Sequence, residues 1–250
     1  MKKLYWVLLA TASAGAAALR FWQMRSGFDA LGLPVSRHPA ALSLLVLLLA
    51  ASAAFIGFSV SLRRSRIDED REITAYFPGG NTCSAALGIG GAFLLAASAA
   101  FSLLGYRASL METLLPIFLL ASAAAALRAV FLLFRAEKPD GTLMLFSVSY
   151  LALHLIFLYR KGASDPVLGH YVIALLAVAA LAAALLEAAA FAFRNGSPCL
   201  FLLAGSLAAV LSFAAAAELR SLAQTLFFAG FALVDLSFLS GASLPAVQAK

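Results

Sequence analysis

The sequence has 250 residues, of which 63% are hydrophobic and only 12% are charged. A soluble globular domain is about 45–50% apolar and about 25% charged, so this composition excludes a soluble globular protein. The apolar stretches are continuous rather than alternating, which predicts membrane-spanning helices and excludes a barrel of strands. Spans of about 20 residues leave room for roughly eight crossings and no soluble domain. We therefore expect residues 1–250 to form one all-α, polytopic transmembrane helix bundle.

The formal charge of +6 comes from basic residues that lie singly or in small groups at the ends of apolar stretches. This distribution is typical of topology signals, so the lipid bilayer is the expected partner and nucleic acid is not. Cys83 and Cys199 are too few and too far apart to predict a disulfide scaffold or a metal cluster. No zinc-protease, hydrolase, P-loop or dinucleotide-binding motif occurs. The sequence therefore nominates no catalytic, cofactor-binding or metal-binding residue.

The first apolar stretch, 4–22, follows Lys2 and Lys3 and contains small residues that a signal peptidase would accept. Cleavage is one interpretation, but we expect the helix to be retained because Arg20 and Trp22 form a natural interfacial end. The other predicted spans follow in chain order: 40–62, 82–104, 111–134, 142–159, 168–193, 199–217 and 222–239.

Three features of these spans need an explanation. Gly88, Gly90 and Gly91 in span 82–104 either break the helix for a solute or, as we favour, mark contacts with a neighbouring helix. Pro139-Asp140-Gly141 predicts a tight turn and hence an antiparallel hairpin of the fourth and fifth spans. The charged segment 218–221 must also contain a turn, because one helix over 199–239 would be about 60 Å long, twice the hydrocarbon thickness.

Lys and Arg are unequally divided between the two predicted faces of the bundle. Eleven of the 18 lie on the face of the N-terminus, and seven lie on the opposite face. The positive-inside rule then places the N-terminus and the C-terminus in the cytoplasm, with a multi-pass protein in a bacterial cytoplasmic membrane.

Ionisable groups inside hydrocarbon are costly, so Arg128, Glu187 and Asp235 stand out in the apolar spans. Arg128 and Glu187 lie about 10 Å from the N-terminal face, and Asp235 is slightly shallower. In a functional interpretation they line a cavity in which Glu187 or Asp235 binds a cation or a proton and Arg128 modulates it. In a structural interpretation, which we favour, Arg128 pairs with Glu187 or extends to the lipid headgroups.

Tyr150 and His154 share one face of the fifth span because they are four residues apart. A histidine without a second ligand nearby is more often a packed core residue than a metal ligand. His38 and His170 fall in or beside loops, and the three histidines lack zinc-site spacing. We therefore expect His154 to be a packing residue.

The connector after the first span carries a resemblance to known proteins. Residues 20–29 are followed by Gly32-Leu33-Pro34 and then by Arg37-His38-Pro39-Ala40. This stretch resembles one in uncharacterised multi-spanning membrane proteins of anaerobic Gram-positive bacteria, in which Phe-Asp and Gly-Leu-Pro follow the first helix. The resemblance covers residues 20–40 and implies no activity or site residue, because those proteins have no assigned function.

The same connector holds a compact set of polar and aromatic side chains: Trp22, Arg25, Phe28, Asp29, Arg37 and His38. One interpretation is an outer lid in which Asp29 pairs with Arg25 or Arg37 beneath Phe28. The interpretation that we favour is an aromatic belt at the membrane surface followed by a turn.

Three functions remain open for an integral membrane protein of this kind. A small-solute or ion permease is weakly favoured, and it requires a water-accessible cavity that reaches Glu187 and Asp235. A non-catalytic structural or partner-binding subunit would instead be a dry bundle that contacts a membrane protein or a second copy of itself. An intramembrane enzyme acting on lipid would need converging polar groups at one surface, for which Arg25, Asp29, Arg37 and His38 are the compact candidates.

Overall fold

The computed structural model describes residues 2–29, 33, 35, 37–64, 77, 79–105, 110–137, 140–163 and 171–242. Within these ranges it contains eight α-helices and no β-sheet. The helices are α1 (Lys2–Ser26), α2 (Pro39–Arg64), α4 (Thr82–Leu104), α5 (Leu110–Phe134), α6 (Gly141–Gly162), α7 (Val172–Ala192), α8 (Pro198–Ala216) and α9 (Leu222–Gly241). All eight are long and apolar enough to cross a membrane. The predicted all-α bundle of eight spans is thus confirmed, and the chain is an integral, multi-pass membrane protein in contact with lipid.

The helix boundaries follow the local capping chemistry of the sequence. Asp140 accepts a hydrogen bond from the backbone N–H of Thr142 at 3.0 Å and so begins α6, which packs against α5. Ser221 accepts one from the N–H of Gln224 at 3.2 Å and begins α9 in the same way. The turn before it includes Leu219 with a φ of 49°, so the predicted break between the last two spans is confirmed. The predicted start of the sixth span, 168–171, falls partly on residues outside the described ranges.

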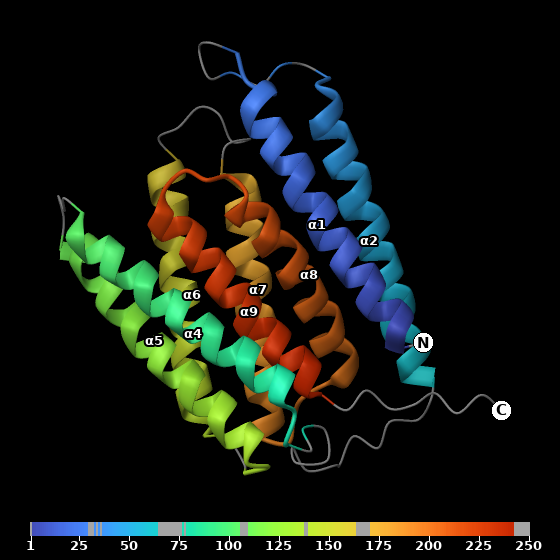
Figure 1. The fold of residues 1–250 in the computed structure, drawn as a ribbon, viewed down its shortest axis with the longest axis vertical. Helices are drawn as coiled ribbons and strands as arrows, with labels where there is room; N and C mark the ends of the chain where they lie inside the picture. Colours follow the sequence, from blue (N-terminus) through green and yellow to red (C-terminus); the bar gives the residue numbers. More distant parts are fainter. Residues whose placement is uncertain are drawn as a thin grey trace.

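Helices that follow one another in the chain run in opposite directions, so the bundle has two distinct faces (Figure 1). Helices α1, α4, α6 and α8 end at one face, which we call the Arg20 face, and α2, α5, α7 and α9 begin there. The opposite face, where α1 begins, is the Lys3 face. Any site near the ends of α4, α6 and α8 therefore opens toward the Arg20 face.

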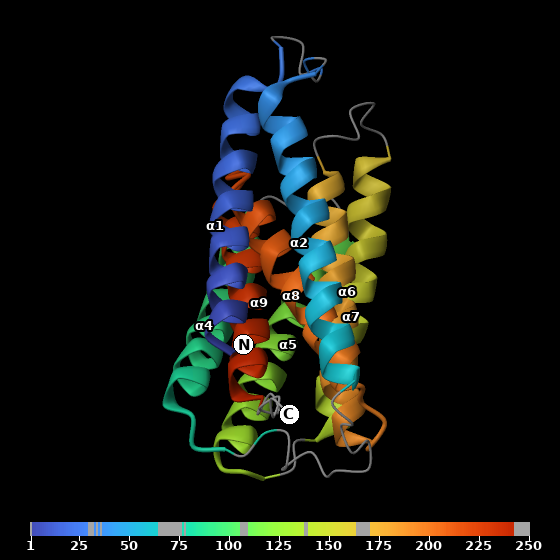
Figure 2. The ribbon, with the colours of Figure 1, turned by 90° about the vertical axis from the view of Figure 1, so that its right-hand side faces the viewer.

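Helices α7, α8 and α9 form the interior of the bundle. Half or more of their spanning residues are buried inside the protein, against 17% for α2. Helix α8 packs against α1, α2, α7 and α9, so it joins the α1–α2 hairpin to the other helices (Figure 2). The hydroxyl of Ser59 on α2 donates a hydrogen bond to the carbonyl oxygen of Cys199 at 2.7 Å. Such interhelical hydrogen bonds and small residues hold helices together where lipid provides no hydrophobic driving force.

The closest helix approach is between α4 and α9. A Cβ atom on Gly91 would lie 2.7 Å from the carbonyl oxygen of Gly230, and one on Gly88 would lie 2.5 Å from the side chain of Val130. Helix α4 is continuous through these positions. Gly88 and Gly91 are therefore helix contact points as favoured above, whereas Gly90 faces open space.

Candidate solute-binding cavity

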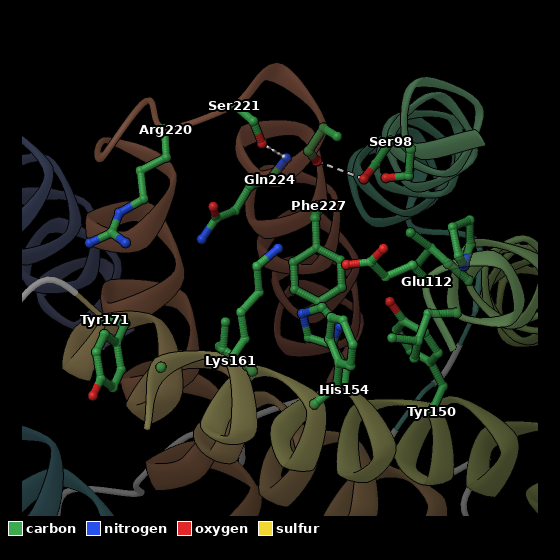
Figure 3. Close-up of a pocket in the computed structure, with 18 residues that line it drawn as sticks. Ser98, Glu112, Tyr150, His154, Lys161, Tyr171, Arg220, Ser221, Gln224 and Phe227 are labelled. Atoms are coloured by element: carbon green, nitrogen blue, oxygen red, sulfur yellow. Dashed lines mark hydrogen bonds between the residues drawn. The ribbon is translucent and has the colours of Figure 1, made fainter. Parts of the chain in front are cut away.

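A cavity of about 730 Å³ enters the bundle from the Arg20 face. This volume lies within the range of roughly 300–1,000 Å³ that is typical of small-molecule sites. Its walls come from α4, α5, α6 and α9, with Tyr171 just before α7 and Arg220 in the turn before α9 (Figure 3). Because five different parts of the fold contribute to it, no single motif in the sequence marks this site.

The cavity reaches about the middle of the membrane. Its lining on α6 extends from Gly162, at the helix end, down to Tyr150. These residues are separated by about 18 Å along the helix axis at 1.5 Å per residue. The hydrocarbon core is about 30 Å thick, so a molecule on the cavity floor would lie near the bilayer midplane.

The floor of the cavity is aromatic. Tyr150 and His154 stack on one face of α6 with ring centroids 5.8 Å apart. The ring of His154 also lies 4.6 Å from that of Phe227 on α9, and Phe231 stacks on Tyr150 at 6.3 Å. Each helix provides two rings four residues apart, the spacing that places side chains on one face. Since Phe231 is fully buried, these rings separate the cavity from the interior below.

His154 provides a polar atom at this floor. Its ring packs as predicted, but its buried Nδ1 atom has no hydrogen-bond partner. Buried polar atoms in native proteins are nearly always hydrogen-bonded, so each exception needs an explanation. A group of three or more His, Cys, Asp or Glu that could hold a metal does not occur among the described residues. Because Nδ1 is buried, a molecule in the cavity would contact the face of the His154 ring and not this nitrogen.

Charged side chains lie higher in the cavity, nearer its mouth. Glu112 comes from the first turn of α5 and Lys161 from the last turn of α6. Figure 3 shows their side chains reaching toward Phe227 from opposite sides, with the amide of Gln224 beside them. The cavity thus presents an acid and a base on facing walls above an aromatic floor.

A buried set of charges connects the cavity to α1. The Glu218 carboxylate accepts hydrogen bonds from Nε and Nη2 of Arg20 at 3.0 and 2.6 Å. Its other oxygen lies 2.9 Å from Nε of Arg220, which lines the cavity. Arg20 also donates to the side-chain carbonyl of Gln23 at 2.8 Å, and only 1% of the Arg20 and Glu218 side chains is exposed.

Sequence reasoning treated Arg20 as an interfacial residue and segment 218–221 as a turn, and it missed this buried pair. One signal was available, because Arg20 and Glu218 end spans that run in the same direction and therefore lie at the same face. The contact between α1 and α8, which brings the two residues together, was not readable from the sequence.

The structure does not bring Arg128, Glu187 and Asp235 together. Arg128 is exposed on the outer surface of α5, and Glu187 on α7 accepts a hydrogen bond from the backbone N–H of Ser197 at 3.2 Å. Helix α6 packs against both α5 and α7 and lies between them, which is why Arg128 and Glu187 form no ion pair. Asp235 is 1% exposed and lies against α8. Its Oδ1 atom would be 3.2 Å from a Cβ built on Gly205.

The connector after α1 forms a local turn beside the membrane surface. The ring centroids of Trp22 and His38 are 5.8 Å apart, and the guanidinium of Arg25 lies 4.4 Å above the ring of Phe21. Asp29 accepts a hydrogen bond from the N–H of Leu33 at 2.8 Å. The backbone N–H of Asp29 in turn donates to the carbonyl of Leu33 at 2.9 Å.

The residues proposed above for an outer lid all lie in the described part of this connector. None of Trp22, Arg25, Phe28, Asp29, Arg37 and His38 lines the cavity. Arg37 adopts a left-handed φ of 57° just before α2 begins. A turn therefore lies between α1 and α2, and the aromatic belt at the membrane surface stays a prediction.

Comparison with known proteins yields no further assignment: no family model, no curated protein and no solved structure matches this chain. The case for a function therefore depends on the cavity and on the helices that form it.

Proposed function

We propose that this protein is a permease for a small zwitterionic organic solute, which binds in the cavity between α4, α5, α6 and α9. The observation that carries the proposal is a cavity of about 730 Å³ that enters from one face and ends near the midplane on an aromatic floor. Transporters place their substrate sites near the bilayer midplane, with access from one face at a time.

The lining supports this class of solute. Glu112 attracts a cationic group and Lys161 an anionic group, and the two side chains extend from facing walls. An apolar part of the solute would pack against the rings of Phe227 and His154. Small-molecule sites commonly combine an apolar lining with a few placed polar groups.

The direction of access follows from the charge distribution. The positive-inside rule assigns the Lys3 face to the cytoplasm, so the Arg20 face and the mouth of the cavity would be outside the cell. In this state the permease would receive solute from outside, and a second state would release it inside. The localisation in a bacterial cytoplasmic membrane is part of this proposal.

The first test measures whether water fills the cavity. Cys83 and Cys199 are replaced by Ser, and a single cysteine is introduced as Gln224→Cys in the cavity wall. The matched control is Leu186→Cys, since Leu186 is 48% exposed on the outer surface of α7. We expect the membrane-impermeant reagent 2-sulfonatoethyl methanethiosulfonate to label Q224C in sealed proteoliposomes and not L186C. Equal and slow labelling of both would mean that the cavity is dry, as a structural subunit requires.

The second test measures transport. Proteoliposomes are given a mixture of neutral amino acids, dicarboxylates and primary amines, and the internal content is identified by mass spectrometry. We expect selective accumulation of a zwitterionic member of the mixture, lost after labelling of Q224C and retained in a Leu186→Ala variant. A labelled cavity without accumulation of any compound would favour a ligand-binding subunit over a permease.

A further inference from the structure

We propose that Asp235 is a proton-binding site that couples solute movement to a proton gradient. The coupling role rests on the permease function proposed above, whereas proton binding at Asp235 does not. The site is separate from the solute cavity, because Asp235 is not among its lining residues and lies eight residues beyond Phe227 on α9.

The hydroxyl groups nearest the Asp235 carboxyl group donate their hydrogens to other acceptors. The hydroxyls of Tyr5 and Ser206 are 2.7 Å apart, and Ser206 follows Gly205, where an added Cβ would lie 3.2 Å from Oδ1 of Asp235. The Ser206 hydroxyl donates to the carbonyl of Leu202 at 2.6 Å. A hydroxyl has a single hydrogen, so Tyr5 must be the donor to Ser206. Neither hydrogen is left for Asp235, and its Oδ2 atom has no hydrogen-bond partner.

Within the described residues, no cation pairs with Asp235. Helix α4 contains no charged residue, and neither does α8. On α5 Arg128 faces outward, and on α7 Glu187 bonds to the N–H of Ser197. On α1 Lys3 is exposed, and the Tyr5 hydroxyl bonds to Ser206. An unpaired carboxylate in hydrocarbon is costly, so the protonated acid is the form that fits this packing.

The packing around Asp235 favours a proton over a metal cation. A Cβ on Gly205 would already be 3.2 Å from Oδ1 of Asp235 and 2.9 Å from Leu239, so α8 and α9 are in direct contact here. A hard cation such as Ca²⁺ or Mg²⁺ requires about six oxygen ligands. A proton needs one carboxylate oxygen and no extra volume.

Helix α9 supplies the mechanical connection between the two sites. Phe227 lies at the cavity floor, and Phe231 packs below it. On α9, Phe227 precedes Asp235 by about two turns and Phe231 precedes it by about one turn. Loss of the proton leaves a charge that is stable only if water reaches it, which requires α9 to separate from α8. Such a movement also displaces the floor rings. In one cycle the carboxyl group takes a proton from water at one face and releases it to water at the other.

The first test detects the proton itself. Infrared spectra of the protein in nanodiscs are recorded across pH in H₂O and D₂O, and the carbonyl stretching band of a protonated carboxylic acid is followed. We expect a deuterium-sensitive band at neutral pH that disappears in Asp235→Asn and persists in Glu187→Gln. A spectrum in which D235N matches the wild type at neutral pH would overturn proton binding at Asp235.

A second variant keeps the assignment testable if D235N does not fold. Gly205→Ala presses a methyl group against Oδ1 without removing the carboxyl group, so it should shift the same band. An unshifted band in a folded G205A protein would also contradict the assignment.

The second test measures coupling through α9. The labelling rate of Q224C is measured as a function of pH in the presence of Asp235 and in D235N. Both rates rise with pH because the thiolate is the reacting form, so the ratio of the rate with Asp235 to the rate in D235N is compared. We expect this ratio to change at least about threefold across the pH range in which the band titrates. A rate that follows pH equally in both backgrounds would overturn the coupling.

Transport assays separate this proposal from the permease function. Uptake that is unaffected by a proton gradient and by D235N would refute coupling and leave the permease standing. A titrating band with pH-dependent labelling, but no uptake of any compound in the mixture, would refute the permease and leave the proton site standing.

Discussion

At the scale of single residues, the buried polar groups fall into two kinds. Most serine hydroxyls bridge helices, as Ser98 does by donating to the carbonyl of Ala223 at 2.6 Å. Among the described residues, four buried polar atoms have no hydrogen-bond partner: Nδ1 of His154, Oγ of Ser212, Oε2 of Glu218 and Oδ2 of Asp235. Oε2 of Glu218 pairs with Arg220 instead, and Ser212 belongs to neither of the two sites proposed here. The case for Asp235 therefore depends also on its burial against α8, where a charge is costly.

The ion pair between Arg20 and Glu218 gives a prediction about stability. Replacing Glu218 by Ala removes the buried carboxylate that Nε and Nη2 of Arg20 contact, which should lower the free energy of unfolding by about 3–5 kcal/mol. Arg220→Ala is the matched control. Arg220 pairs with the same carboxylate but its side chain is 31% exposed, so its loss should cost no more than about 1 kcal/mol. Denaturant unfolding in detergent micelles measures both.

A double variant completes this experiment. Arg20→Met with Glu218→Met removes both charges, and apolar replacement of a buried pair is often neutral or stabilising. We expect the double variant to be more stable than E218A. If E218A and R220A lost equal stability, the Arg20 side chain would be hydrated rather than buried.

At the scale of helices, close contact between α4 and α9 depends on individual glycines. A Cβ on Gly91 would lie 2.7 Å from the backbone oxygen of Gly230. A backbone atom cannot rotate away as a side chain can, so the two helices must separate to admit it. Gly90 is the adjacent residue, and a Cβ there meets nothing within 4 Å. The two positions therefore share their helix and depth and differ in what they contact.

We predict opposite effects for alanine at these two glycines. Gly91→Ala should destabilise the protein by about 1–3 kcal/mol through overpacking. Gly90→Ala should be neutral, or should stabilise α4 by up to about 1 kcal/mol because alanine favours the helix. Thermal unfolding in the same detergent measures the difference. Similar melting temperatures for the two variants would show that α4 and α9 are not in direct backbone contact in the membrane protein.

At the scale of the whole molecule, hydropathy and turn chemistry predicted which segments cross the membrane, because span length and capping are local properties. They did not predict which helices are neighbours. A helix that is apolar on every side gives no sign of which face meets which neighbour. The sequence therefore predicted the depth of Arg128 and Glu187 in the membrane, but it did not predict that α6 lies between their helices. For the same reason the contact of α1 with α8, which creates the Arg20–Glu218 pair, escaped sequence analysis.

The cavity was unpredictable for a related reason. It exists where α4, α5, α6 and α9 leave volume unfilled, and unfilled volume has no sequence pattern. Only its floor was partly readable, since Tyr150 and His154 were expected on one face of the fifth span. That Phe227 and Phe231 complete the floor depends on where α9 packs.

Filling the cavity tests whether its volume is functional. Gln224→Trp adds an indole ring to the cavity wall at the level of Lys161 and Phe227 (Figure 3), and it should obstruct the path to the floor. We expect uptake by proteoliposomes to fall at least about tenfold, equivalent to 1.4 kcal/mol in binding free energy. The unfolding temperature should be nearly unchanged, because the added ring occupies existing space. Leu186→Trp places the same side chain against lipid and should leave uptake intact. If Q224W transported normally, solute would have to cross by a route other than this cavity.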